Sequence, residues 1–536
     1  MATPAAQAEH APLVVVADRP RWLPRVLLAV ASGLCLSSAF PATDVEPLAG
    51  VGLVPLLVAV EGVTPRVAFG LGWLSGLTFY VVTCYWVVYT IVHYTAVPLP
   101  LAVGVLLLMS GVLGCYTAAF AAGLRWFEDR GISAIWVAAP LWVTLEWLRG
   151  SRFFIGFPWA PLGASQYRYH DLVQMAEVTG VYGVSAFLVL FNAIAAATFT
   201  RRGSDARRLL PGLVTLTILA IGLPTAGRWR AESLRRSPPA GHLRVAVAQG
   251  NVAQDQKWDP AFQGETMARY EGLTRSAMVG SPPELVVWPE TATPFFFQEP
   301  RPLRESVLDL AASSHVHLLF GSPAFSQSHG GEVLESNRAY LVSPEGRELA
   351  TYDKMQLVPF GEYVPLGPLL FFVDKMVTGI GRIAPGLSPT VFGLPSGRFG
   401  TLICYEGIFP GLTRRFVAGG ADFLVNITND AWYGRSAAPY QSLAQVTLRA
   451  VENRVPIIRA ANTGISAVID ADGRIRWQSE LFEMAWHTED ITWSGVRTFY
   501  SLYGDVFVWA CAGITLVAIA VGIWRDRRRP RVIDLG

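Results

Sequence analysis

Long apolar stretches fill the first 225 residues of this chain and return once near its end. A helix needs roughly 20 apolar residues to cross a bilayer. Charged residues make up only 16% of the chain, whereas soluble domains carry about 25%. The sequence therefore predicts a polytopic α-helical membrane domain of about eight spans, the second of them short enough to be re-entrant. The candidate spans lie near 24–40, 47–61, 67–92, 98–124, 132–148, 181–200, 208–225 and 505–524.

Arginines gather in the N-terminal tail, in alternate loops and in the C-terminal tail. Basic residues favour the cytoplasmic side of a membrane. We therefore expect cytoplasmic tails at 1–23 and 525–536, a bundle of about seven spans at 24–228, a periplasmic domain at 240–495 and a last helix at 505–524. The expected location is the bacterial inner membrane, with several passes. The arginines are Arg19, Arg21, Arg25, Arg66, Arg125, Arg130, Arg201, Arg202, Arg207, Arg208, Arg525, Arg527, Arg528, Arg529 and Arg531.

The long polar segment alternates short apolar runs with helical stretches. Such alternation predicts an α/β domain, in which reactive groups gather just beyond strand ends. Helices are expected at Arg304–Ser313 and Tyr440–Asn453. Strands are expected at Leu243–Gln249, Glu284–Pro289, His317–Gly321, Asn337–Val342, Gly400–Cys404, Phe423–Ile427, Val455–Ala460 and Ser466–Ile469.

Charge and residue usage exclude several classes of site. The net charge of +2 argues against a nucleic-acid partner. No His or Cys pair has metal-ligand spacing, so we expect no metal and no cofactor. Of five cysteines only Cys404 lies in the polar segment, where it is either inert or a nucleophile. Lysine occurs only at Lys257, Lys354 and Lys375, which suggests a need for the compact ammonium there unless these lysines survived by chance.

Three polar residues follow apolar runs and together form a chemical set. Glu290 ends VVWPE, Lys354 lies in YDKMQ and Cys404 lies in LICYE. Alone, each has an ordinary interpretation: a solvated loop carboxylate, half of a surface pair with Asp353, and a structural thiol. Together, a carboxylate can deprotonate a thiol and an ammonium can stabilise an oxyanion.

The segments WPET, YDK with PFGEYVP, and ICYE resemble, in order, the catalytic motifs of the nitrilase superfamily. That resemblance implies an αββα sandwich with a Glu–Lys–Cys triad. QGNVAQDQKW at 249–258, GFPWAPLGASQ at 156–166 and NDAWYG at 429–434 narrow the resemblance to the apolipoprotein N-acyltransferase family, from about 24 to 524.

The resemblance implies a role for each matched residue. Glu290 corresponds to the general base, Lys354 to the oxyanion stabiliser and Cys404 to the nucleophile. Glu362 corresponds to a further catalytic glutamate that positions the base and the lysine. Two neighbours of the nucleophile match residues needed for activity, and a tryptophan matches one on a mobile loop over the site. These three are Tyr405, Glu406 and Trp258.

The implied reaction moves an acyl chain from a membrane phospholipid, through a cysteine thioester, to the N-terminal amine of a diacylated apolipoprotein. We expect a monomer. One alternative is a membrane-anchored amidase or nitrilase with the same triad, and another is a transporter or lipid-binding protein with an inactive nitrilase fold. The second alternative predicts loss of a triad residue, and none is lost.

Several aromatic residues remain open to two interpretations. Trp432 and Tyr433 either cover the acyl channel and contact substrate, as expected for Trp258, or anchor the domain at the membrane interface. The apolar runs 295–297 and 371–373 are either core or lids that dip into lipid.

Overall fold

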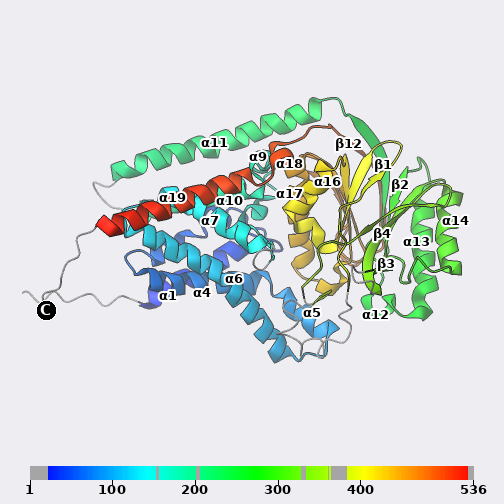
Figure 1. Cartoon of the computed structure of the whole chain (residues 1–536), viewed down its shortest axis with the longest axis horizontal. Helices are drawn as coiled ribbons and strands as arrows, with labels where there is room; N and C mark the ends of the chain where they lie inside the picture. Colours follow the sequence, from blue (N-terminus) through cyan, green and yellow to red (C-terminus); the bar gives the residue numbers. More distant parts are fainter. Residues whose placement is uncertain are drawn as a thin grey trace, which may run out of the picture.

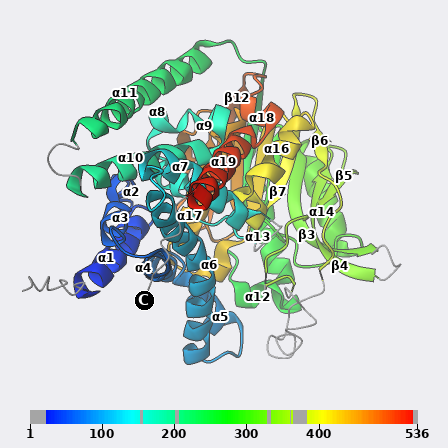
Figure 2. The ribbon, with the colours of Figure 1, turned by 60° about the vertical axis from the view of Figure 1, so that its left-hand side comes forward.

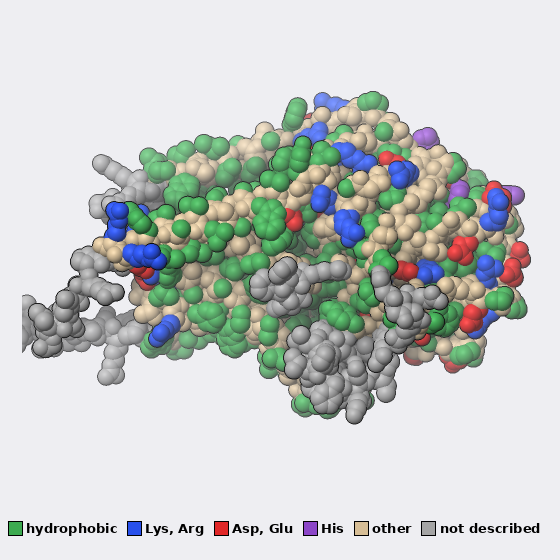
Figure 3. Space-filling model, viewed as in Figure 1, with side chains coloured by type: hydrophobic (Ala, Val, Ile, Leu, Met, Phe, Trp, Pro, Cys, Tyr) green, Lys and Arg blue, Asp and Glu red, His purple; other side chains and the backbone are tan. Residues whose placement is uncertain are grey.

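The structure is a computed structural model that describes residues 22–151, 156–200, 206–327, 333–359, 361–363 and 383–528. A helical bundle forms one side of the molecule and two β-sheets form the other (Figure 1). Apolar side chains cover the visible face of the bundle, whereas charged side chains gather on the α/β part and at the far end of the bundle (Figure 3). This division matches the apolar and polar halves of the sequence.

Every apolar stretch predicted as a span forms helix. The short helices between and beside them are α2 (Leu48–Val51), α3 (Val54–Ala59), η1 (Leu162–Gln166), α8 (His170–Val173), α9 (Ala176–Thr179) and α18 (Phe499–Tyr503). The long helices are α1 (Trp22–Ser38), α4 (Pro65–Thr83), α5 (Trp86–Tyr94), α6 (Leu99–Glu128), α7 (Ala134–Gly150), α10 (Val181–Thr200), α11 (Ala206–Arg236) and α19 (Val506–Arg528).

The expected count of about eight spans is not confirmed. In the described part of the chain, four helices are long and apolar enough to cross a membrane, or five if α4 and α5, bent by 53°, form one span. The stretch at 47–61 breaks into α2 and α3, and α1 and α7 have only 17 residues each. A side chain satisfies backbone groups at this break, because Leu53 N donates to Asn192 Oδ1 at 2.8 Å and Asn192 Nδ2 donates to Ala49 O at 2.8 Å.

Helices α4 and α6 pack closely because glycines face the contact. A Cβ added to Gly76 would lie 2.7 Å from Gly114 Cα, and one added to Gly72 would lie 2.7 Å from Thr117 O. Any larger residue would therefore push the helices apart, as expected of a small-residue motif in a membrane bundle. The bend after α4 then directs α5 out of the bundle (Figure 2).

The α/β part contains two six-stranded sheets in the orders β12-β1-β2-β3-β4-β5 and β11-β10-β9-β8-β7-β6. All eight predicted strands are confirmed, with ends shifted by a few residues. The sheet edges β5, β6, β11 and β12 were not predicted. The strands are β1 (Gly241–Gln249), β2 (Leu285–Val287), β3 (His317–Gln327), β4 (Val333–Val342), β5 (Glu348–Asp353), β6 (Val391–Gly393), β7 (Arg398–Ile403), β8 (Phe423–Thr428), β9 (Ile457–Ala461), β10 (Ala467–Ile469), β11 (Ile475–Gln478) and β12 (Ala485–Trp493).

Helices cover the outer face of each sheet and complete the expected four layers. α13 (Gln263–Ala277) and α14 (Pro302–Ser314) lie on the first sheet, whereas α16 (Pro410–Ala418) and α17 (Ala438–Asn453) lie between the second sheet and the bundle (Figure 1). Each catalytic candidate follows the end of a strand: Glu290 after β2, Lys354 after β5 and Cys404 after β7.

The apolar run 295–297 is part of a core rather than a lid. Phe295 and Phe297 are buried under α14, and Phe296 stacks on Phe325 with ring centroids 4.0 Å apart. The second run, 371–373, lies outside the described residues.

Candidate active site

The carboxylate of Glu290 lies among hydrogen-bond donors just beyond β2. Oε1 accepts from Asn337 Nδ2 at 2.7 Å and from Lys354 Nζ at 3.3 Å, and Oε2 accepts from Asn429 N at 2.8 Å. A Cβ added to Gly321 on β3 would lie 2.8 Å from Glu290 Cα, so this close approach requires glycine. The carboxylate is therefore held in one place and one orientation.

Lys354 lies between two carboxylates and is 1% exposed. Its ammonium donates to Glu362 Oε1 at 2.7 Å as well as to Glu290. Burial alone would lower the pKa of Lys354, but the two carboxylates raise it well above its usual value. Asp353 pairs instead with Arg338 at 2.6 Å. The interpretation of Lys354 as the surface partner of Asp353 is therefore wrong.

Cys404 is the first residue after β7 and has a φ of 54°. A cysteine rarely adopts this left-handed conformation, and such strain is common at functional sites. Its side chain is buried, and burial together with the nearby Glu290 carboxylate raises the pKa of the thiol to about 12, although the Lys354 ammonium lowers it. The resting thiol is therefore protonated and needs a base before it can react.

Glu406 joins the segment that carries Lys354 to the turn that carries Cys404. Oε1 accepts from Tyr352 Oη at 2.9 Å and from Met355 N at 2.6 Å, and Oε2 accepts from Ile403 N at 2.8 Å. Burial raises the pKa of Glu406 to about 7, although the backbone donors lower it. This geometry places Glu406 behind the reacting groups, as a link between two loops.

Tyr405, Trp432 and Tyr433 lie where helices of the bundle meet the catalytic part. Tyr405 is buried, and Trp432 is half-exposed against Tyr94 of α5, with ring centroids 4.8 Å apart. Tyr433, at the end of η5 (Asp430–Tyr433), is close enough to Cys404 for a charge there to raise the tyrosine's pKa, which burial already raises. The contact with α5 fits both interpretations of Trp432, as a cover or as an anchor.

Gln441 on α17 fastens the bundle to this site. Its Oε1 accepts from Trp159 Nε1 at 2.8 Å and from Trp86 Nε1 at 3.3 Å, and its Nε2 donates to Pro41 O at 2.9 Å. Trp86 also packs against Tyr433, with ring centroids 5.0 Å apart. One amide thus connects three segments of the bundle to the aromatic wall beside Cys404, which consists of Trp86, Trp159 and Tyr433.

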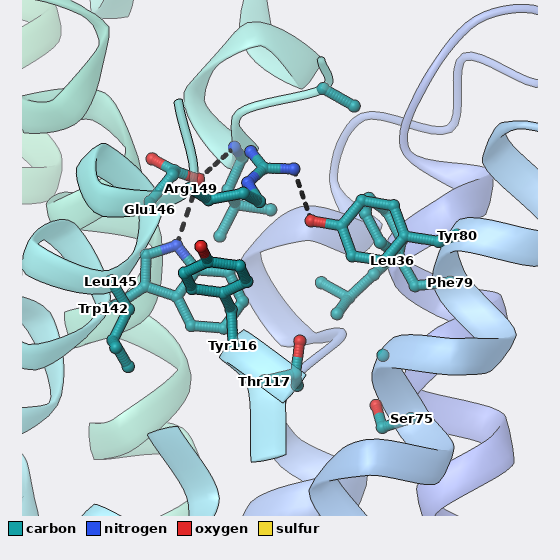
Figure 4. A pocket seen from close by; sticks show the side chains of 13 residues that line it. Leu36, Ser75, Phe79, Tyr80, Tyr116, Thr117, Trp142, Leu145, Glu146 and Arg149 are labelled. Atoms are coloured by element: carbon teal, nitrogen blue, oxygen red, sulfur yellow. Dashed lines mark hydrogen bonds between the residues drawn. The ribbon is translucent and has the colours of Figure 1, made fainter. Parts of the chain in front are cut away.

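A cavity inside the bundle approaches the same wall. Helices α1, α4, α6 and α7 line it, and polar groups of Tyr80, Glu146 and Arg149 lie at one end (Figure 4). Arg149 donates to Tyr80 Oη and to Trp159 O at 2.8 Å. The charge of Arg149 also reaches Tyr405, the neighbour of Cys404. The cavity therefore meets the catalytic part through Trp159, whose ring centroid lies 6.3 Å from that of Tyr433.

The described residues contain no group of three or more His, Cys, Asp or Glu side chains that could hold a metal ion. The groups that do converge are a thiol, a carboxylate and an ammonium. This set can perform nucleophilic acyl chemistry through a cysteine thioester.

Comparisons with known proteins identify the family of this chain. The family model "Apolipoprotein N-acyltransferase N-terminal domain" matches residues 32–194, and the model "Carbon-nitrogen hydrolase" matches residues 244–499. The apolipoprotein N-acyltransferase of Geobacter metallireducens is 43% identical, over 92% of this chain and 94% of that protein. The chain belongs to the apolipoprotein N-acyltransferase family.

A second curated relative gives the same result. The apolipoprotein N-acyltransferase of Chlorobaculum tepidum is 33% identical, over 95% of this chain and 98% of that protein. Among solved structures, a nitrilase-superfamily amidase from Nesterenkonia is 20% identical, covers 48% of this chain and 93% of that chain, and has a TM-score of 0.36. As an apolipoprotein N-acyltransferase family member, the chain is an acyltransferase of lipoprotein biosynthesis, and its apolar helices agree with a bacterial membrane-bound enzyme.

Sequence reasoning missed several residues that shape the site of this N-acyltransferase. Asn337 and Asn429 hold Glu290, and Gln441 with its two tryptophans holds the wall beside Cys404. Asn429 lies in the segment NDAWYG and Trp159 in GFPWAPLGASQ. The sequence therefore pointed to both segments, but not to the hydrogen bonds of these residues with Glu290 and Gln441. Trp258 is about half-exposed at the rim, directly after the buried Lys257.

Proposed function

We propose that this enzyme takes an acyl chain from a membrane phospholipid, holds it as a thioester on Cys404 and passes it to the N-terminal amine of a diacylated apolipoprotein. The observation that carries the proposal is the convergence of the Glu290 carboxylate, the Lys354 ammonium and the Cys404 thiol in a buried site beside the membrane bundle. Membership of the N-acyltransferase family supports the acceptor.

The first half-reaction begins with proton transfer. Glu290 takes the thiol proton of Cys404, and the thiolate attacks the ester carbonyl carbon of the phospholipid. The oxyanion that forms is stabilised by Lys354. When the tetrahedral intermediate collapses, the ester C–O bond breaks, the leaving oxygen receives the proton from Glu290, and a lysophospholipid departs.

The second half-reaction uses the same groups in reverse roles. The free amine of the lipoprotein attacks the thioester carbon and loses a proton to Glu290. Collapse of this second intermediate breaks the C–S bond, and Cys404 recovers its proton. A water-poor site protects the thioester from hydrolysis. Burial of the three reacting side chains and the aromatic wall of Trp86, Trp159 and Tyr433 support such a site.

The isolated first half-reaction tests this proposal. Enzyme incubated with phospholipid but without lipoprotein should gain one acyl mass on the peptide that contains Cys404, measured by mass spectrometry. A diacylated lipopeptide with a free amine should discharge the acyl group, and the same lipopeptide with an acetylated amine should not. Glu290→Gln should block loading because the thiol then keeps its proton.

Two results would count against the proposal. If loading never occurs without lipoprotein, the acyl group passes within a ternary complex instead of through a free acyl-enzyme. If water discharges the thioester as fast as the lipopeptide does, an amidase-like hydrolase becomes the better description.

We also propose that the catalytic part, from about 240 to 495, lies in the periplasm and that the enzyme works as a monomer in the inner membrane. The arginine distribution supports this orientation. A reporter active only in the periplasm should work when fused after Ser396 and fail when fused after Gly203. Fluorescence of a reporter active only in the cytoplasm, fused at the same two sites, provides the complementary control. The reverse pattern would contradict the orientation.

A further inference from the structure

Lys257 is a buried cation that the mechanism so far does not use. It ends the short helix α12 (Gln254–Lys257) and is 3% exposed, whereas its neighbour Trp258 is 49% exposed. Of the 43 Lys and Arg residues of the chain, only three are lysines. A lysine buried next to a reactive site is therefore unlike the usual basic residue of this protein.

The contacts of Lys257 place it at the active site. Its ammonium donates to the backbone carbonyl of Glu290 at 3.1 Å. Burial lowers the pKa of Lys257 to about 8, while the charges of Glu290 and Cys404 raise it. The segment before it is also fixed to the site, because Asn429 Nδ2 donates to Gln254 Oε1 at 2.8 Å.

The other charges around Cys404 are already matched. Lys354 is shared by the carboxylates of Glu290 and Glu362. Asp430, which also acts on the thiol, pairs with Arg459 at 2.8 Å. Among the described residues, by contrast, Lys257 forms no ion pair and has a carbonyl oxygen as its hydrogen-bond partner. Its charge is therefore not neutralised by direct contact.

We propose that Lys257 is a second functional cation of this active site, whose charge stabilises the Cys404 thiolate and the oxyanion derived from it. The inference rests on the proposed function in taking Cys404 as the nucleophile. Lys354 is paired with two carboxylates, which leaves one negative charge beside the sulfur, and the positive charge of Lys257 offsets it. Lys257 is a positioning residue, because its hydrogen bond goes to the backbone carbonyl of Glu290 and it acts on the sulfur only through its charge.

The test measures alkylation of Cys404 in the full-length enzyme in detergent, without lipid substrate. The rate is read by mass spectrometry on the Cys404 peptide. Lys257→Gln keeps a donor for the Glu290 carbonyl but removes the charge, and Lys257→Met removes both. Below the pKa of the thiol, each unit by which that pKa rises lowers the thiolate population, and so the rate, about tenfold. We expect both variants to react with iodoacetamide at least about tenfold more slowly than wild type at neutral pH.

A second reagent separates charge from access. Loss of positive potential should slow anionic iodoacetate more than neutral iodoacetamide, whereas a blocked path would slow both equally. Arg269→Met is the matched control, because Arg269 donates to Gly250 O and Asn251 O at the start of the same segment. This variant should keep the wild-type rates and the wild-type ratio of the two reagents.

Two outcomes would overturn the inference. The first is a wild-type alkylation rate in Lys257→Gln, which would leave Lys257 only a hydrogen-bonding role. The second is an unchanged ratio of the iodoacetate and iodoacetamide rates in both variants. Buried Cys84 reports folding, since it should stay unreactive in a folded variant. If Lys257→Met unfolds, Lys257→Gln decides the question. Failure of the proposed function is distinguishable, because wild-type enzyme would then never acquire an acyl mass whatever the alkylation rates.

Discussion

Replacing Cys404 with serine is expected to lower acyl transfer by at least about a thousandfold. A serine hydroxyl is a much weaker acid than a thiol, and the base available to it is a carboxylate. Three hydrogen-bond donors hold this carboxylate, Glu290, in one place. Serine is nearly isosteric with cysteine, so the site should remain intact while the nucleophile is lost.

The measurement is transfer of a labelled acyl chain from phospholipid to a diacylated lipopeptide in detergent. Cys511→Ser is the matched control, because Cys511 is also buried but lies on α19. This control should keep full activity, and thermal unfolding should show that both variants are folded. Retention of more than about a tenth of the wild-type rate by Cys404→Ser would contradict the assignment of the nucleophile.

Lys354→Arg is expected to lower the rate about a hundredfold or more, although it keeps the positive charge. The ammonium occupies a site that is 1% exposed, between carboxylate oxygens 2.7 and 3.3 Å away. A planar guanidinium is too broad for this volume and would displace Glu290, Glu362 or the substrate oxyanion. The loss should appear mainly in kcat, since the interaction is strongest when the oxyanion forms.

The same acyl-transfer assay measures this variant. Arg244→Lys serves as a surface control, because Arg244 forms an exposed pair with Asp490 at 3.0 Å and exchange there should change little. Full activity of Lys354→Arg would show that a cation of any shape suffices at this position. Lys354 would then be a structural partner of the two glutamates and not the group that stabilises the oxyanion.

Much of the catalytic part was predictable because strands leave a local signal. Runs such as Leu285–Val287 and Phe399–Ile403 are mostly apolar because both faces of those strands are buried. Polar residues that follow such runs must lie where the strands end, so the sequence correctly placed Glu290 and Cys404 at strand ends. The edge strands β5, β6, β11 and β12 were missed, since edges are partly exposed and carry mixed patterns.

By itself, the sequence determined the apolar helices, the α/β domain and the three candidate catalytic side chains, because hydrophobic pattern and motif are properties of short segments. Only the tertiary structure decided which charged side chains form ion pairs and which helices are long enough to span a membrane. Two hydrogen-bond donors to Glu290 come from β4 and from the loop after β8. Gln441 forms hydrogen bonds with residues of the bundle that are up to 400 positions away in the sequence. A buried polar side chain shows no periodicity of its own, and its role depends on donors that folding brings from distant segments.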